Sequence, residues 1–139
     1  MPRRRGRLSR SLEDCLRVIC TVCEERGQAR VKDVAEELGI KSPSALASIK
    51  KLAHMGLVEY ERRRGIRPTR KGEIVCRELL RRREIIKRFL TEVLGIPGDI
   101  AEEDACKLEH CINPLTTRKL AELVKLVEKG RRTREDKSF

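Results

Sequence analysis

Three side chains that commonly bind metals share one short segment, DACKLEHCIN, which covers residues 104–113. Cys106, Glu109 and His110 are spaced at i, i+3 and i+4, so on a helix they would lie on one face. A thiolate, a carboxylate and an imidazole together suit Fe²⁺, Zn²⁺, Co²⁺ or Ni²⁺. Three ligands from one helix need a fourth from elsewhere in the chain. The same spacing also fits a helix with an ordinary polar flank, and spacing alone leaves both interpretations open.

A helix over residues 99–112 would carry these side chains next to its apolar face. At about 100° per residue, five apolar residues form one arc, namely Ile100, Ala101, Ala105, Leu108 and Ile112. The potential ligands form the adjoining arc, in the order Glu109, Glu102, Cys106 and His110. Because this arc borders the expected core, an ion bound there would be partly shielded from water.

Positive charge is concentrated in the first half of the chain. The 139 residues have a formal net charge of +11. Residues 1–71 hold 18 Lys and Arg against 9 Asp and Glu, whereas residues 72–139 hold 15 against 13. A polyanion is therefore the expected partner of the first half.

Two short helices joined by a glycine turn are predicted within this basic half. The first covers residues 31–38 and is closed by Gly39, and the second starts with Ser42 as N-cap and Pro43 at the first helical position. The strand-like run LVEYERRR, a turn at Gly65 and the returning IRPT predict a β-hairpin. Together these elements indicate a winged helix-turn-helix.

The second helix of this pair is expected to enter the major groove of double-stranded DNA. Its small and polar residues would face the bases, and its lysines and the wing arginines would contact phosphates. The predicted DNA-binding residues are Lys41, Ser42, Pro43, Ser44, Ala47, Lys50, Lys51, Arg62, Arg63, Arg64 and Arg67. RNA and single strands are less favoured, because the aromatic fraction of 2% leaves no platform for base stacking. A winged helix that contacts proteins is the alternative.

Helical patterns account for most of the remaining chain. They predict a first helix at residues 11–25 with Ser11 as N-cap, a long helix at 71–94, and a last helix from 116 or 117 to 128. The expected fold is mainly α, an N-terminal winged helix-turn-helix with a small β-wing plus a C-terminal all-helical dimerisation domain. The predicted divisions are a flexible basic arm at 1–10, the DNA-binding domain at 11–72, the helical domain at 73–130 and a polar tail at 131–139.

The absence of long apolar runs and of a secretory signal predicts a cytoplasmic protein. No run of 18 apolar residues and no secretory signal pattern is found. The six cysteines are therefore expected to be thiols or metal ligands rather than a disulfide framework, with intracellular proteins of hyperthermophiles as the exception. Cys20 and Cys23 lie one helical turn apart and are expected to be small core residues.

Several longer stretches carry a further signal. They are SLEDCLRVI near the start, DVAEELGIKSPSALASIKKLAHMGLVEYERRRGIRPTRKG in the middle, and RFLTEVLGI followed by EEDACKLEHCI. In this order they resemble the iron- and manganese-dependent repressors of the diphtheria toxin repressor family, over roughly residues 10–128. The resemblance implies a homodimer that binds a divalent metal and then a palindromic operator, usually repressing genes of metal uptake. It also implies the short two-domain form, without the SH3-like third domain of some members.

The same resemblance assigns the ligands of the main metal site. Its C-x-x-E-H motif is Cys106, Glu109 and His110, and one further ligand from the first helix corresponds to Asp14. The manganese-responsive branch is similar in having Asp at position 14, and the iron-responsive branch in having Cys at position 106. We therefore expect one divalent transition metal ion per protomer, with Fe²⁺ or Zn²⁺ favoured and Mn²⁺ also accommodated.

A second metal site of the family is not expected in this chain. Its His and Glu ligands correspond to Arg83 and Lys87, and neither a guanidinium nor an ammonium has a lone pair to offer. The hypothesis is that Arg83, with Lys87, substitutes electrostatically for the second ion. Arg83 would pair with Glu102 or Glu109.

The predicted function is a metal-dependent transcriptional repressor with the metal as corepressor. An ion joining Asp14 to the second-domain ligands would fix the first helix, and so the separation of the recognition helices in the dimer. Two rivals stay open, a metal-independent winged-helix regulator and a redox regulator using Cys106 with Cys111 or Cys20 with Cys23. An enzyme is not expected, because no Gly-rich loop or oxyanion donor accompanies Cys106 and His110.

Overall fold

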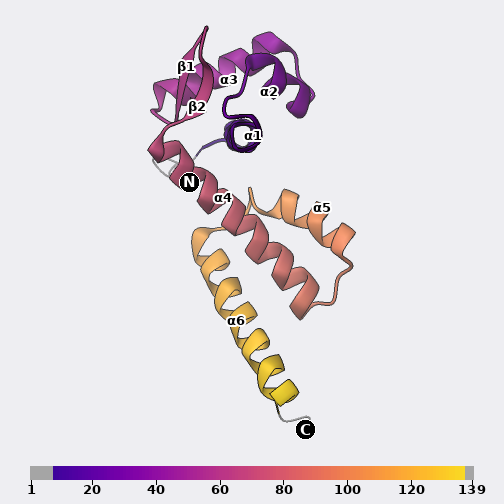
Figure 1. The fold of residues 1–139 in the computed structure, drawn as a ribbon. Coiled ribbons are helices and arrows are strands. Elements are labelled where there is room, and N and C mark those ends of the chain that lie inside the picture. The colour runs from indigo at the N-terminus through magenta and orange to yellow at the C-terminus, as the bar shows by residue number, and fades with distance from the viewer. Residues whose placement is uncertain (1–7, 137–139) are drawn as a thin grey trace. The chain divides into compact units, whose positions relative to one another are not determined.

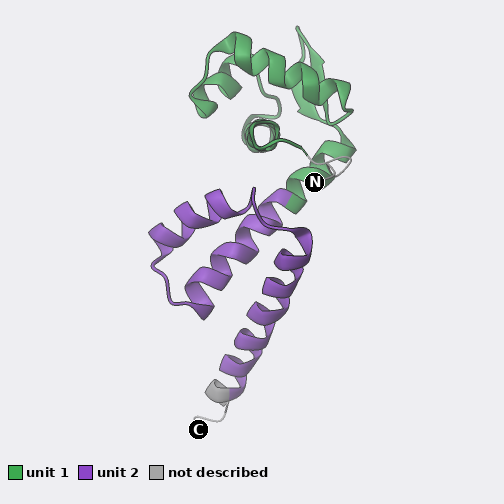
Figure 2. Ribbon diagram, turned by 180° about the vertical axis from the view of Figure 1, so that it is seen from behind, with its two compact units in different colours: residues 1–78 green, residues 79–139 purple. Residues whose placement is uncertain are grey.

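The computed structural model of the protein describes residues 8–136 and divides into two compact units (Figures 1 and 2). The first unit ends at Glu78 and the second begins at Leu79. Of the predicted basic arm, residues 1–7 lie outside the described part. The predicted domain limits at residues 72 and 130 stay predictions.

The first unit begins with helix α1 (Arg10–Arg26). Its N-cap is Ser9 rather than the predicted Ser11, because Ser9 has an extended backbone and its Oγ accepts a hydrogen bond from the Leu12 amide at 3.3 Å. Gly27 ends the helix in the left-handed conformation at φ 84°, as predicted. Leu16 and Ile19 are fully buried and carry the core face.

Helices α2 (Val31–Leu38) and α3 (Ser42–His54) confirm the predicted pair. Gly39 closes α2 in the left-handed region at φ 64°, which permits the tight turn between the helices. Lys41 with its extended backbone is the N-cap of α3, so Ser42 is the first residue of the helix instead of its cap. Ile49 and Leu52 are completely buried and fix the side of α3 that faces the core.

The wing consists of strands β1 (Val58–Glu61) and β2 (Gly65–Pro68). They pair antiparallel, with Val58 opposite Pro68 and Tyr60 opposite Ile66. Ile66 also exchanges two backbone hydrogen bonds with Ala29, of 3.0 Å and 2.8 Å, and its side chain is fully buried. The base of the wing is therefore anchored in the core of the first unit, and its turn residues remain outside.

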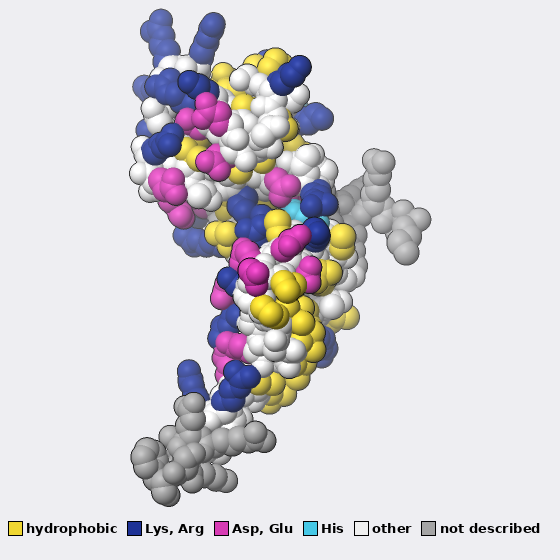
Figure 3. Space-filling model, turned by 90° about the vertical axis from the view of Figure 1, so that its right-hand side faces the viewer, with side chains coloured by type: hydrophobic (Ala, Val, Ile, Leu, Met, Phe, Trp, Pro, Cys, Tyr) yellow, Lys and Arg dark blue, Asp and Glu magenta, His cyan; other side chains and the backbone are white. Residues whose placement is uncertain are grey.

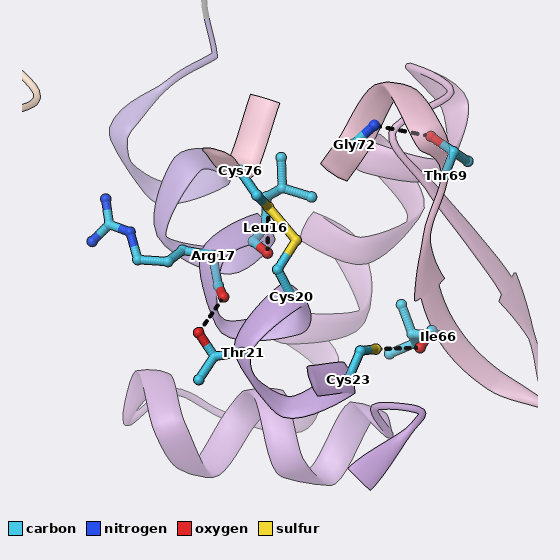
Figure 4. Close-up of a disulfide and its surroundings, with 9 residues drawn as sticks. All are labelled: Leu16, Arg17, Cys20, Thr21, Cys23, Ile66, Thr69, Gly72 and Cys76. Carbon is cyan, nitrogen blue, oxygen red and sulfur yellow. Dashed lines mark hydrogen bonds between the residues drawn. A yellow bond between two sulfur atoms is a disulfide. The ribbon is translucent and has the colours of Figure 1, made fainter. Parts of the chain in front are cut away.

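Helix α4 (Arg70–Arg88) starts in the first unit and continues into the second. Its start packs closely against the chain before β1, where a Cβ on Gly72 would lie 1.9 Å from the carbonyl oxygen of Leu57. Only glycine permits this approach. Thr69 stabilises the same corner by donating a hydrogen bond to the Gly56 carbonyl at 2.6 Å. It also accepts one from the Gly72 amide at 3.1 Å (Figure 4).

A disulfide bond between Cys20 and Cys76 joins α1 to α4 within the first unit (Figure 4). The prediction that Cys20 is a free core thiol was therefore wrong, and neither Cys20–Cys23 nor Cys106–Cys111 forms the bond. The two sulfurs meet because α1 and the start of α4 pack together with both cysteines nearly buried. Their separation of 56 residues hides this proximity from local sequence patterns.

The other two cysteines of the first unit are thiols. Burial raises the pKa of Cys15 to about 11, and burial also raises the pKa of Cys23 against smaller opposing effects of the Ala29 backbone and Arg67. The Cys23 thiol donates a hydrogen bond to the Ile66 carbonyl at 3.2 Å. A raised pKa disfavours the thiolate, which is the form of cysteine that attacks disulfides.

The second unit contains the end of α4, the π-helical turn η1 (Phe89–Val93), α5 (Gly98–Leu108) and α6 (Pro114–Asp136). Its core is small and centres on Ile86, Leu90, Ala101 and Ala105. Two contacts fasten α6 to the end of the long helix: Arg88 pairs with Glu128, and Arg131 donates to the Glu92 carbonyl at 2.6 Å. Consequently α6 extends to Asp136, six residues into the segment predicted as a polar tail.

Other helix limits in this unit also differ from the predictions, because α6 starts at Pro114 rather than 116 or 117, and the long helix and α5 end differently. The long helix changes to a π-helical turn at Phe89, with the Leu94 amide bonded to the Phe89 carbonyl. Helix α5 ends at Leu108, four residues earlier than predicted, because the Cys111 and Ile112 amides both turn back to the Leu108 carbonyl. Within residues 8–136, no helix combines the length and apolar character needed to cross a membrane.

Breaking the disulfide is expected to destabilise the first unit. Closing a loop of 56 residues contributes about 4 kcal/mol in the chain-entropy account, and typical measured losses are about 2–5 kcal/mol. We expect Cys20→Ala/Cys76→Ala to lower the denaturation midpoint and to make it insensitive to added reductant. The control is Cys111→Ala, which removes an exposed thiol and should leave both properties unchanged. Equal midpoints for the wild type and the double variant without reductant would contradict the stabilising role.

Candidate metal centre and nucleic-acid interface

The predicted ligand trio lies at the C-terminal end of α5. Cys106 is within the helix, Glu109 is its C-cap with helical φ and ψ, and His110 follows directly. Glu109 is completely buried, because it continues the i, i+4, i+8 row of buried Ala101 and Ala105. The predicted arc was therefore partly wrong: Ile100 and Leu108 are exposed, and Glu109 takes the buried position.

Glu109 and His110 lie side by side. Nε2 of His110 is 3.3 Å from Oε1 of Glu109, and the His110 side chain is only 3% exposed. Arg82 donates a hydrogen bond to the backbone carbonyl of Glu109 at 2.9 Å, which stabilises the end of α5. A buried carboxylate next to an imidazole provides two of the donor types that transition metals use.

All three side-chain nitrogen atoms of Arg83, on α4, lie near side chains of α5 or its C-cap. Nη2 donates to Sγ of Cys106 at 2.9 Å, and Nε lies 3.6 Å from Oε2 of Glu109. Nη1 is 3.9 Å from Oε1 of Glu102. Both carboxylates named in the pairing hypothesis are thus near Arg83, whereas its contact with the Cys106 sulfur was not predicted. Nothing in the sequence pattern indicates a guanidinium–sulfur contact, since it depends on how α4 and α5 cross.

Lys87 lies one turn further along α4 and binds Glu102. The distance from Nζ to Oε2 is 2.8 Å. The hydrogen bond with Glu102 raises the pKa of Lys87, and the hydrogen bond from Lys87 lowers the pKa of Glu102. Both side chains are more than a third exposed, so solvent screening keeps the contribution of this pair to stability small.

The donor set of the second unit fits a divalent transition metal by its chemistry. Cys106 offers sulfur, Glu109 oxygen and His110 nitrogen. In the structure the side chains of Glu109 and His110 lie next to each other, and the Arg83 guanidinium is close to both Cys106 and Glu109. The remaining predicted ligand, Asp14, is on α1 in the first unit, where Nη1 of Arg17 is 3.9 Å from its carboxylate.

All the residues predicted to bind DNA are exposed on the first unit. On α3 they are Lys41, Ser42, Pro43, Ser44, Ala47, Lys50 and Lys51, and on the wing they are Arg62, Arg63, Arg64 and Arg67. Because Ile49 and Leu52 hold the opposite side of α3 in the core, these residues share the face left to solvent. Dark-blue Lys and Arg side chains project from the end of the first unit in Figure 3.

The fold and the exposed basic surface define a DNA-binding regulator of the winged helix-turn-helix class. Residues 7–66 match the family described as iron dependent repressor, N-terminal DNA binding domain. Residues 69–135 match the iron dependent repressor, metal binding and dimerisation domain. The chain belongs to the iron-dependent repressor family.

Curated relatives and solved structures agree with this membership. The transcriptional regulator MntR of Escherichia coli O6:H1 is 36% identical over 105 residues, covering 76% of this chain and 67% of the relative. A regulator of Methanocaldococcus jannaschii is 39% identical over 108 residues, covering 76% and 86%. A manganese-dependent repressor solved with manganese has a TM-score of 0.71 at 28% identity, and the match covers 82% of this chain but 52% of that one.

The predicted family, fold class and broad function are confirmed by these matches. The chain is a metal-dependent transcriptional regulator, not an enzyme, and its two matched domains bind DNA and metal and form a homodimer. The identity of the metal, the operator and the metal-ligating residues stay predictions.

The exposed arginines of the wing are expected to bind phosphates rather than bases. Replacing Arg62 or Arg63 by Ala should weaken binding to all duplexes alike and reduce the salt dependence by about one released counterion each. Fluorescence anisotropy at several salt concentrations measures both effects. The matched control is Arg118→Ala, an exposed arginine of the second unit, which should leave the salt slope unchanged. A loss confined to one DNA sequence would contradict phosphate contact.

Proposed function

We propose that this chain is a homodimeric repressor that one divalent transition metal ion per protomer activates for operator binding. The proposed ligands are Cys106, Glu109 and His110 of the second unit and Asp14 of the first. The supporting observation is the completely buried Glu109 carboxylate beside the nearly buried His110 imidazole. A buried carboxylate is costly unless a cation or donors accompany it. Bound there, a divalent ion supplies positive charge and directional bonds that hold these donors together.

The ligand types favour Fe²⁺ or Zn²⁺ and also accommodate Mn²⁺. The sulfur of Cys106 favours softer ions, whereas the carboxylates of Asp14 and Glu109 suit harder ones. One related solved structure, a manganese-dependent repressor, holds manganese, and another, ScaR, holds Zn²⁺. The donor chemistry supports a transition metal, and we propose Fe²⁺ or Zn²⁺ ahead of Mn²⁺.

Asp14 is proposed to couple the metal to DNA binding through α1. Helix α1 packs against α2, α3 and β2 in the first unit, with Leu16 and Ile19 in their common core. Holding Asp14 therefore constrains the recognition helix α3 without any contact to DNA. Typical coupling free energies of about 1–3 kcal/mol correspond to a roughly 5- to 150-fold change in DNA affinity.

The dimer surface is proposed to lie on the helices after Gly95 together with part of α4. Hydrophobic side chains gather on the second unit in Figure 3. The exposed apolar residues of this unit are Leu80, Leu94, Ile100, Leu108, Leu115, Leu123 and Leu126. Exposed large apolar side chains that gather on one part of a protein are common at protein interfaces. A two-fold dimer would present two α3 helices to a palindromic operator, with half-sites spaced by a whole number of DNA turns.

The test of this function is a DNA-binding titration with and without Fe²⁺, Mn²⁺ and Zn²⁺. We expect the metal to raise the affinity of the wild type for its selected duplex by roughly 5- to 150-fold. His110→Ala should lose this response, because it removes the imidazole ligand while leaving α3 untouched. The control Lys107→Ala alters an exposed side chain on the same helix and should respond like the wild type. Equal wild-type affinity with and without metal would favour the metal-independent regulator.

Arg83 and Lys87 are proposed to replace a second ion electrostatically. Arg83 lies near Glu102 and Glu109, and Lys87 binds Glu102, so two fixed cations already balance these carboxylates. We expect elemental analysis of the purified dimer to find one metal ion per protomer, both in the wild type and in Lys87→Ala.

Arg83→Ala is expected to change operator affinity, because Glu109 loses its cationic neighbour. Unchanged stoichiometry together with unchanged operator affinity in Arg83→Ala would rule out the substitution.

A further inference from the structure

Arg83 lies among the donors that the proposed metal site would use. Its guanidinium donates to Sγ of Cys106 at 2.9 Å and lies 3.6 Å from the carboxylate of Glu109. The Arg83 side chain is 25% exposed and the Glu109 side chain is fully buried. Two of the three proposed ligands in this unit are therefore in contact with one protein cation.

Arg83 provides a positive charge next to Cys106 and Glu109 while no ion is bound. A buried carboxylate without a counter-charge destabilises a fold strongly, and the guanidinium provides that counter-charge at 3.6 Å from Oε2 of Glu109. The same charge opposes a divalent ion, because like charges a few ångströms apart repel strongly where water is excluded. Metal and guanidinium therefore compete for the same two side chains.

A receiving group for the displaced guanidinium is already in place. Oε1 of Glu102 is 3.9 Å from Nη1 of Arg83, and the Glu102 side chain is 48% exposed. Lys87 holds the other oxygen of Glu102 at 2.8 Å, which keeps this carboxylate next to Arg83. A modest rotation of the long Arg83 side chain would transfer it from the buried donors to Glu102 at the surface.

We propose that Arg83 sets the metal affinity of the site as a resident counter-ion of Cys106 and Glu109, which an incoming ion replaces. The inference rests on the proposed function, because it takes Cys106 and Glu109 as ligands. On binding, the Cys106 sulfur and the Glu109 carboxylate would exchange the guanidinium for the ion, the guanidinium would move to Glu102, and any proton held by the sulfur would pass to the buffer. Arg83 does not coordinate the ion. It lowers the metal affinity of the site, so that a higher metal concentration is required for binding.

The experiment is a Co²⁺ titration followed by the thiolate-to-cobalt charge-transfer absorption, with Zn²⁺ competition for the second metal. The proteins are the wild type, Arg83→Met and the matched control Lys107→Met, which removes an exposed cation of α5 whose partner is Glu103. We expect Arg83→Met to bind Co²⁺ and Zn²⁺ tighter by at least about 10-fold, and Lys107→Met by less than about 3-fold. Unchanged or weaker binding by Arg83→Met, or equal gains in both variants, would overturn the inference.

Two further variants keep the test decisive. Arg83→Lys retains the charge but loses the planar fork, so it should fold if Arg83→Met does not and should bind Co²⁺ moderately tighter than the wild type. No gain in Arg83→Lys would count against the inference in that case. Cys106→Ser should lose the charge-transfer band. A band that is absent from every protein would remove Cys106 as a ligand and overturn both proposals, whereas a normal band with unchanged affinities overturns only the role of Arg83.

Discussion

The burial of the Glu109 carboxylate is the constraint on which the second unit depends. A charged group that is completely buried must be balanced, and the structure places Arg83 and His110 beside it. Arg82 binds the backbone carbonyl of the same residue, so two consecutive arginines of α4 hold one end of α5. These polar contacts join α4 to the end of α5 beside the small core of Ile86, Leu90, Ala101 and Ala105.

The first unit is organised around a different interaction, the aliphatic core beneath the recognition helix. Leu16 and Ile19 of α1 and Ile49 and Leu52 of α3 are fully buried together, and the Cys20–Cys76 bond ties α1 to α4. A constraint placed on α1 is therefore passed to α3 through rigid packing. This is the physical basis for proposing that a ligand on α1, Asp14, can influence DNA binding.

Helix positions and the exposed basic surface were largely predictable because they depend on local signals. Apolar periodicity and the turn at Gly39 defined α2 and α3, and the charges of the wing indicated its partner. Errors occurred where a helix end depends on contacts from elsewhere. Helix α6 continues to Asp136 because Arg131 and Glu128 bind the end of the long helix, and no local pattern encodes those partners. The prediction that Ile100 and Leu108 belong to the buried face of α5 was wrong, because the helix packs through the narrower row of Ala101, Ala105 and Glu109.

The sequence by itself determined the class of protein, the recognition helix, the basic wing and the identity of the candidate ligands. The helix-turn-helix, the wing and the Cys106, Glu109 and His110 set follow from residue types and short spacings, which act over one or two helical turns. The family and the ligand Asp14 follow from the resemblance of the longer stretches. Only the tertiary structure decided that Cys20 bonds to Cys76, that Glu109 is buried, and that Arg83 lies against the Cys106 sulfur. Each of these joins segments at least 23 residues apart or depends on how two helices cross. Packing free energy sets such geometry, and it is a property of the whole fold rather than of any local stretch.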